Sequence, residues 1–108
     1  MIKLTIGIPT YNRNDLLANL LDSIVSETLV LADTAIKVLV ADNSLDRKAE
    51  CVYLNFTQKL EIEYIHVISP GIPIVRNAIL NHVDGGYLLF LDDDVLLRRG
   101  MLELTLNY

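Results

Sequence analysis

Segments with strand character alternate with segments of helical character along the whole chain. Strand patterns cover residues 2–8, 36–41, 61–65 and 87–91, and helical patterns cover 16–25, 46–56, 73–81 and 100–108. Alternation of this kind is typical of a parallel sheet with helices on both faces. We therefore predict an α/β fold, formed by residues 1–108 as one domain.

Two local signals indicate where the first elements begin and end. Pro9 lacks a backbone N–H, and we predict that the first strand ends there because proline cannot donate to a sheet ladder. Asn12 or Asn14 is expected to cap the helix that follows, since an asparagine side chain accepts hydrogen bonds from free N–H groups at a helix start.

The third strand pattern predicts the order of the sheet. Charged and apolar residues alternate from Glu61 to Ile65, which suits an edge strand because charge discourages stray pairing. Right-handed crossovers then favour a Rossmann-like parallel sheet of order 3-2-1-4. The fourth strand, Tyr87 to Leu91, becomes the other edge, although its continuously apolar sequence suits a strand with neighbours on both sides. We therefore expect the chain to be the N-terminal half of a larger domain, or to pair through this edge in a homodimer.

The composition limits the partners of the chain. Its net charge of −5 and pI near 4.8 argue against nucleic acid, which requires a basic face. Binding of a single nucleotide remains compatible with this negative charge if a metal ion bridges the nucleotide phosphates and the acidic side chains. The lone Cys51 allows no intramolecular disulfide and fits a reducing compartment. We expect neither a secretory signal nor a membrane span, since no apolar run approaches the roughly 20 residues that a span needs.

Three adjacent aspartates, Asp92, Asp93 and Asp94, end the fourth strand pattern. Their carboxylates repel one another, so this position is costly unless a cation or a polar ligand lies there. Mg²⁺ and Mn²⁺ prefer oxygen ligands and often take one or two carboxylates together with substrate phosphates. The pattern therefore predicts a metal–phosphate site, and a solvated acidic loop is the alternative.

Polar clusters also follow the first and second strands, at Pro9–Arg13 and Asp42–Ser44. In an open parallel sheet, ligands bind outside the carboxyl ends of the strands, near the point where the strand order reverses. We therefore expect these clusters to share one crevice with the aspartates. There Tyr11 could stack on a base, Asp42 could accept a hydrogen bond from a ring N–H, and Arg76 could pair with phosphate. Taken singly each has a structural explanation, but their common location favours a binding site.

Four segments in this order resemble those of a known enzyme family. They are Thr5–Arg13, Val38–Ser44, Gly71–Ala78 and Phe90–Asp94, and they extend from one end of the chain to the other. Together they are similar to the N-terminal, nucleotide-binding half of a family 2 glycosyltransferase with the GT-A fold. The resemblance implies an enzyme that transfers a sugar from a nucleotide-diphosphate-sugar, typically a UDP-sugar, to a saccharide or lipid-linked acceptor.

The resemblance also implies roles for the nucleotide-binding residues. Pro9, Thr10, Tyr11 and Asp42 would hold the base of the donor, which is typically uracil. Arg76 would approach the base or the phosphates.

The acidic residues would correspond to the DxD motif of the family. Asp92 and Asp93 would contact the ribose or the sugar. Asp94, together with Asp92, would bind a divalent metal, Mn²⁺ or Mg²⁺. The metal would act as a Lewis acid for the departing nucleoside diphosphate.

Two departures limit what the resemblance implies. The family often has Ala-Arg-Asn followed by a small residue, whereas this chain has Val75-Arg76-Asn77 and then Ile79, which could tighten the pocket. The family's catalytic base and acceptor-binding elements lie in a C-terminal half that is missing here. We therefore assign no catalytic residue and expect weak donor binding without transfer by this chain alone. The expected location is cytoplasmic, and the sequence leaves open whether the full protein lies at the cytoplasmic face of a membrane, as many relatives do.

Other protein classes also place aspartates on a parallel sheet. A receiver-like domain needs acids after the first strand and a lone aspartate after the third, where this chain has Pro-Thr-Tyr and Ile65-His66. A metal-dependent nucleic-acid-cleaving or topoisomerase-like domain usually adds a glutamate after the first strand and a basic surface, both absent from this sequence. A non-catalytic nucleotide-binding or dimerisation module is the alternative that stays open.

Overall fold

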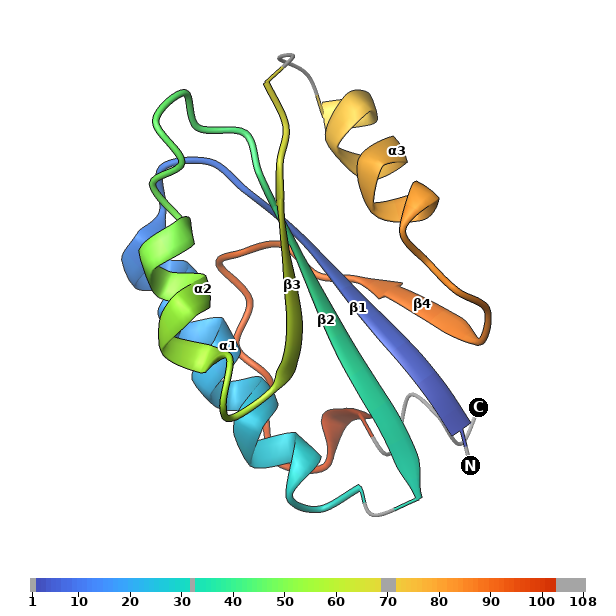
Figure 1. Cartoon of the computed structure of the whole chain (residues 1–108). Helices are drawn as coiled ribbons and strands as arrows, with labels where there is room; N and C mark the ends of the chain where they lie inside the picture. Colours follow the sequence, from blue (N-terminus) through green and yellow to red (C-terminus); the bar gives the residue numbers. More distant parts are fainter. Residues whose placement is uncertain (1, 32, 69–71, 103–108) are drawn as a thin grey trace.

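The computed structural model describes residues 2–31, 33–68 and 72–102, which form a parallel sheet between two layers of helices (Figure 1). The strands are β1 (Ile2–Thr10), β2 (Thr34–Asp42), β3 (Glu61–His66) and β4 (Tyr87–Phe90). The helices are α1 (Asn14–Thr28), α2 (Glu50–Phe56) and α3 (Ile72–Asn81). The sheet order is β3-β2-β1-β4 with parallel pairing throughout, which confirms the predicted class, the order and the edge position of β3. Among the described residues, no helix is both long enough and apolar enough to cross a membrane.

The two faces of the sheet are packed in two separate cores. The larger core lies between the sheet and helices α1 and α2, and it includes Leu4, Ile6 and Ile8. The smaller core lies on the face covered by α3 and includes Leu39 of β2 and Ile79 of α3. Figure 1 shows α1 and α2 on one side of the sheet and α3 on the other. Because both faces are covered, the central strand β2 can contribute apolar side chains to both cores.

Strand β1 continues through Thr10, so the prediction that it ends at Pro9 was wrong. The carbonyl of Gly7 accepts a hydrogen bond from Leu91 N on the β4 side, and the carbonyl of Thr10 accepts one from Asn43 N on the β2 side, both at 3.0 Å. Pro9 lies two residues after Gly7 and therefore faces the β4 side, where β4 has already ended. The missing N–H of Pro9 thus interrupts no ladder, and the pairing with β2 continues.

Neither asparagine caps α1 with its side chain, contrary to the prediction. Arg13 occupies the N-cap position, and no side-chain hydrogen bond is formed there. Asn12 has a φ of 53°, a left-handed conformation that asparagine tolerates better than most residues. The Nδ2 of Asn14 donates to the carbonyl of Lys48 at 2.8 Å instead, so Asn14 joins the start of α1 to the loop before α2.

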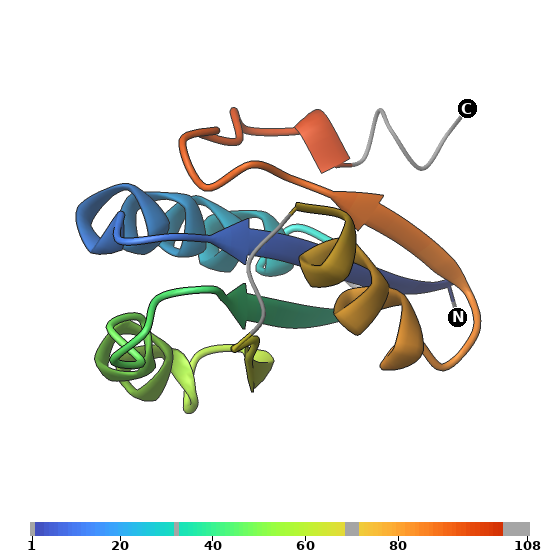
Figure 2. The same ribbon diagram turned by 90° about the horizontal axis from the view of Figure 1, so that it is seen from above.

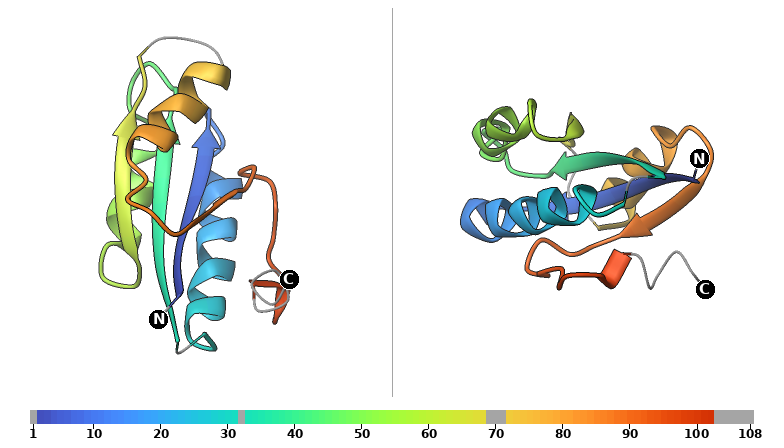
Figure 3. Two further views of the ribbon diagram at one scale, coloured as in Figure 1. Left: turned by 90° about the vertical axis from the view of Figure 1, so that its right-hand side faces the viewer. Right: turned by 90° about the horizontal axis from the view of Figure 1, so that it is seen from below.

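The segment after β4 returns along α1 (Figures 2 and 3). The buried carboxylate of Glu27 in α1 accepts hydrogen bonds from the backbone N–H groups of Gly100 and Leu102, both at 3.1 Å. Leu102 is 1% exposed and belongs to the larger core. Of the helix predicted for residues 100–108, residues 101–102 are helical, and residues 103–108 lie outside the described part.

Candidate functional site

The carboxyl ends of the parallel strands meet at one edge of the sheet, and a cavity of about 470 Å³ lies there. Thr10 at the end of β1 pairs with Asp42 at the end of β2, and the three aspartates follow β4 after one intervening residue. The residues that line the cavity are Pro9, Thr10, Tyr11, Arg13, Asn43, Val75, Arg76, Asp92, Asp93 and Asp94. Seven of the eight residues predicted for the site are among them, and Asp42 is the exception.

An aromatic ring and a guanidinium group are among the groups that line the cavity. Tyr11 is 57% exposed, so a face of its ring is open to a ligand. Arg76 lies on α3, and its guanidinium carbon is 5.3 Å from the centre of the Phe90 ring. This stacking restricts the orientation of the guanidinium while its N–H donors stay available. The two groups are those that the sequence predicted for a base and for a phosphate.

The three aspartates also line the cavity, and they differ from one another in exposure. Asp93 is buried, and it accepts hydrogen bonds from the hydroxyl of Thr10 at 2.9 Å and from the guanidinium of Arg13 at 3.3 Å. Asp92 and Asp94 are exposed and line the cavity. The arrangement therefore leaves two of the three carboxylates open to a ligand.

The donor set of Asp92 and Asp94 fits a divalent cation only in part. Both supply the hard oxygen atoms that Mg²⁺ and Mn²⁺ prefer. Within residues 2–31, 33–68 and 72–102, however, no three histidine, cysteine or acidic side chains are grouped so that they could hold a metal together. A cation at this position would need further oxygen atoms from a ligand, and a diphosphate supplies them. The two aspartates stay a predicted metal pair.

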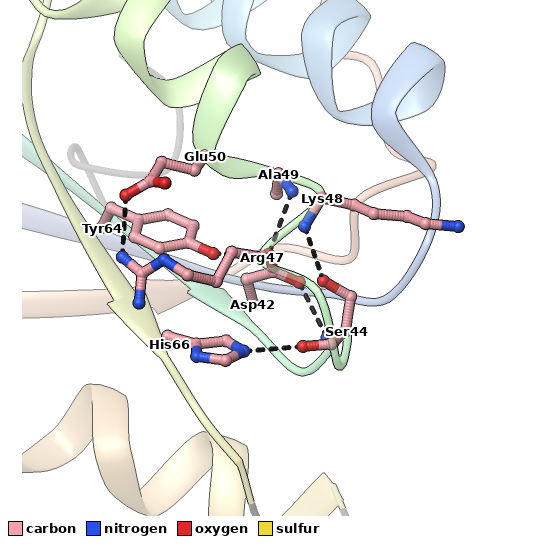
Figure 4. A network of polar contacts seen from close by, with 8 residues as sticks. All are labelled: Asp42, Ser44, Arg47, Lys48, Ala49, Glu50, Tyr64 and His66. Carbon is pink, nitrogen blue, oxygen red and sulfur yellow. Dashed lines mark hydrogen bonds and ion pairs between the residues drawn. The ribbon is translucent and has the colours of Figure 1, made fainter.

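Asp42 does not reach the cavity because its carboxylate holds the loop between β2 and α2 (Figure 4). The side chain is 0% exposed. Its Oδ1 accepts a hydrogen bond from Ser44 N at 2.9 Å, and its Oδ2 accepts from Ala49 N at 3.0 Å and from the hydroxyl of Tyr64 at 2.6 Å. The predicted hydrogen bond from a base to Asp42 stays a prediction, and it would require this fully buried carboxylate to become accessible. The next residue, Asn43, lines the cavity instead.

Further contacts fix the same loop against β3. The Oγ of Ser44 accepts a hydrogen bond from Lys48 N at 2.9 Å, and the ring nitrogen Nε2 of His66 lies 2.7 Å from the carbonyl oxygen of Ser44. Arg47 has a φ of 56° and its guanidinium carbon lies 4.9 Å from the centre of the Tyr64 ring. Because residues 43–49 are held in this way, α2 begins at Glu50 rather than at residue 46 as predicted.

The ionisation of Asp42 and Tyr64 is coupled. Burial raises the pKa of Asp42, but the hydrogen bonds from Tyr64, Ser44 and Ala49 outweigh it and hold that pKa below its ordinary value. Burial also raises the pKa of Tyr64, and the hydrogen bond to the Asp42 carboxylate raises it further. The folded chain therefore favours a charged Asp42 beside a neutral Tyr64.

We expect the stability advantage of the wild type over Tyr64→Phe to decrease in alkali. The hydroxyl of Tyr64 stabilises the fold while it is neutral, and its pKa is raised by folding. This contribution is fully present below the unfolded pKa of about 10 and is lost as the pH rises toward the folded pKa. Urea denaturation of both proteins between about pH 8 and pH 11 measures the difference. A difference that is constant over this range would contradict the expectation.

Sequence reasoning gave no role to three residues that line the cavity: Arg13, Asn43 and Val75. Arg13 and Asn43 belong to the polar clusters at the strand ends, so their location could have indicated them. The side chain of Val75 is 3% exposed and packs in the smaller core. Val75 is thus a core residue that also lines the cavity.

Comparison with known proteins identifies one family over nearly the whole chain. The family model described as Glycosyl transferase family 2 matches residues 5–108. Glycosyltransferase GlyA of Streptococcus pneumoniae is 31% identical over 101 residues, which cover 94% of this chain and 14% of GlyA. The chain thus spans a small part of the length of this curated relative.

Solved structures share the fold. The crystal structure of Staphylococcus aureus TarS 1–349 matches 98% of this chain and 32% of its own, with a TM-score of 0.82 and 21% identity. Its complex with UDP-GlcNAc matches 98% of this chain and 30% of its own, with a TM-score of 0.77 and 25% identity. Mannosyltransferase PcManGT from Pyrobaculum calidifontis, in complex with GDP-Man and Mn²⁺, matches 92% of this chain and 30% of its own, with a TM-score of 0.78 and 22% identity.

Proposed function

The chain belongs to glycosyl transferase family 2 and has the GT-A fold, and from this premise we propose that it forms the binding site for a nucleotide-diphosphate-sugar donor, with a UDP-sugar as the expected donor. The observation that carries the proposal is one cavity at the carboxyl ends of the strands that combines Tyr11, Arg76, Asp92 and Asp94. Two neighbouring structures support the donor class, since TarS 1–349 is in complex with UDP-GlcNAc and PcManGT is in complex with GDP-Man.

In this proposal the nucleotide lies along the wall formed by the end of β1, the loop after β2 and α3. The base stacks on the open face of Tyr11, beside Pro9 and Thr10. The guanidinium of Arg76 donates to a phosphate oxygen, which its stacking on Phe90 favours by restricting its orientation. Asp42 contributes to this wall by holding the loop after β2.

A divalent cation would lie between the diphosphate and the exposed carboxylates of Asp92 and Asp94. Three aspartates and two arginines line the cavity, so a bare diphosphate would be repelled by the open carboxylates. A cation that binds both the diphosphate and the carboxylates removes this repulsion. When bound, it would supply Lewis-acid stabilisation of the leaving nucleoside diphosphate. The complex of PcManGT with Mn²⁺ supports this part of the proposal.

For the whole protein we propose sugar transfer to a saccharide or lipid-linked acceptor. This chain would contribute the donor-binding part, while the catalytic base and the acceptor site would come from other elements. The proposal is consistent with the lengths of the relatives, since the chain spans 14% of GlyA and 32% of TarS 1–349.

Calorimetric titration with UDP tests the donor site. We expect Mn²⁺ to strengthen UDP binding by the wild-type chain about tenfold or more, because the cation joins the diphosphate to Asp92 and Asp94. Asp94→Ala should abolish this metal-dependent gain. Asp22→Ala is the matched control, since Asp22 is an exposed aspartate on α1 outside the cavity.

Each outcome distinguishes the alternatives, provided that circular dichroism shows a folded chain. UDP binding that is independent of Mn²⁺ would retain the nucleotide site and contradict the metal pair. No binding by the folded chain would contradict the donor site and favour the non-catalytic dimerisation module.

A further inference from the structure

The middle residue of the three aspartates has a different environment from its neighbours. Asp93 is 5% exposed, whereas Asp92 and Asp94 are exposed. Its Oδ2 accepts a hydrogen bond from the hydroxyl of Thr10 at 2.9 Å, and its Oδ1 accepts one from the guanidinium of Arg13 at 3.3 Å. Both oxygens of this carboxylate are therefore engaged by protein groups.

These two contacts join the aspartates to the loop that carries Tyr11. Thr10 and Arg13 lie on either side of that loop's aromatic residue, and they are separated from Asp93 by 83 and 80 residues in sequence. The backbone around Asp93 is held by a second type of contact, since Val95 N donates to the carbonyl of Asp92 at 3.1 Å. The side chain of Asp93 therefore connects a closed turn to the end of β1.

The charges on these residues explain why the middle carboxylate is the buried one. A carboxylate can be buried when charged groups and hydrogen bonds compensate it. Arg13 supplies the opposite charge and Thr10 supplies a neutral donor. Three adjacent carboxylates would otherwise repel one another. Once Arg13 and Thr10 compensate the charge of Asp93, the two carboxylates that remain uncompensated, Asp92 and Asp94, are not adjacent in sequence.

We propose that Asp93 is a positioning residue, which sets the places of Asp92 and Asp94 relative to Tyr11 and does not itself contact the donor or the metal. The inference rests on the donor site proposed above. It differs from the expectation that Asp93 contacts the ribose or the sugar. A residue that holds metal-binding side chains in place typically changes metal affinity 10- to 100-fold when it is replaced, without being a ligand.

Amide hydrogen exchange in the free chain tests the positioning role without any ligand. Asp93→Asn removes the charge that pairs with Arg13, and Thr10→Val removes the hydroxyl donor while keeping the shape. Each should speed the exchange of the Val95 N–H about tenfold, as the loss of one buried hydrogen bond implies. Asp22→Asn, on the exposed surface of α1, should leave this rate unchanged. An unchanged Val95 rate in both test variants would overturn the proposal.

A double-mutant cycle on UDP affinity in the presence of Mn²⁺ supplies the second readout. Asp93→Ala, which removes both acceptor oxygens, and Thr10→Val should each raise the Kd about tenfold. The Kd of the double variant should not exceed the higher of the two single-variant values by much, because the Thr10 hydroxyl has no partner left once the Asp93 carboxylate is removed. Losses that multiply to about 100-fold would mean that Thr10 and Asp93 contact the donor separately, and would overturn the proposal. If the wild type does not bind, the donor site fails, while the exchange rates still decide the role of Asp93.

Discussion

Replacement of Asp42 by asparagine is expected to lower the free energy of unfolding by about 3 kcal/mol at neutral pH. The carboxylate is 0% exposed and accepts three hydrogen bonds, from Ser44 N, Ala49 N and the hydroxyl of Tyr64. Whichever way an asparagine amide is turned, its nitrogen faces at least one of these donors. A buried donor is then left unpaired, which costs more than the net value of the hydrogen bond that it made. Urea denaturation at neutral pH measures the loss.

The loss in free energy of unfolding that Asp42→Asn causes should become smaller in acid. Burial raises the pKa of Asp42, but the hydrogen bonds from Tyr64, Ser44 and Ala49 outweigh burial and lower it. Because the folded pKa is below the unfolded value of about 4, the stabilisation is complete above that value and is lost as the pH falls through the folded pKa. The difference between wild type and Asp42→Asn is therefore expected to be smaller at about pH 3 than at pH 7.

Asp46→Asn is the matched control for Asp42→Asn, because Asp46 is an exposed aspartate in the same loop. Its effect should stay within about 0.5 kcal/mol, as is usual for surface substitutions. A loss of less than about 1 kcal/mol for Asp42→Asn at neutral pH would mean that the loop is held mainly by other contacts.

The class of fold and the order of the strands could be predicted because they depend on periodicity and on charge. The charged alternation from Glu61 to Ile65 identified an edge strand, and right-handed crossovers then gave the order that the structure has. The location of the site followed from the same reasoning, since the carboxyl ends of parallel strands share one edge. Residues as distant as Tyr11 and Asp94 could therefore be placed in one cavity from the sequence.

The individual side-chain contacts could not be predicted, because they depend on which residues meet across the sheet. Asp42 precedes Asn-Ser and so reads as a turn residue, but its partner Tyr64 is 22 residues away on β3. The three aspartates are chemically identical in the sequence, and the end of β1 decides that Asp93 is the buried one. Pro9 was expected to end β1 because the sequence does not show that β4 stops before it.

Gly7→Ala is expected to lower the free energy of unfolding by about 2 kcal/mol. Gly7 lies in β1 opposite α3, and a Cβ there would lie 2.6 Å from Cγ2 of Ile79 and 3.3 Å from its Cδ1. Ile79 is 0% exposed and branched at Cβ, so Cγ2 cannot move away without displacing its neighbours. The smaller entropy of the unfolded alanine chain would offset the loss by up to about 1 kcal/mol, which the clash exceeds.

The clash itself can be separated from other effects of Gly7→Ala with two further variants. Ile79→Ala removes Cγ2 and leaves room for the new methyl group, so Gly7→Ala should cost at least about 1 kcal/mol less in the Ile79→Ala background than in the wild type. Backbone strain does not contribute, because Gly7 does not have a positive φ. If urea denaturation shows that Gly7→Ala lowers the free energy of unfolding equally in both backgrounds, contact with Ile79 is not the reason why residue 7 must be glycine. A lower cost in the Ile79→Ala background would mean that the close packing of α3 on β1, which also places Arg76 beside the cavity, depends on the absence of a side chain at residue 7.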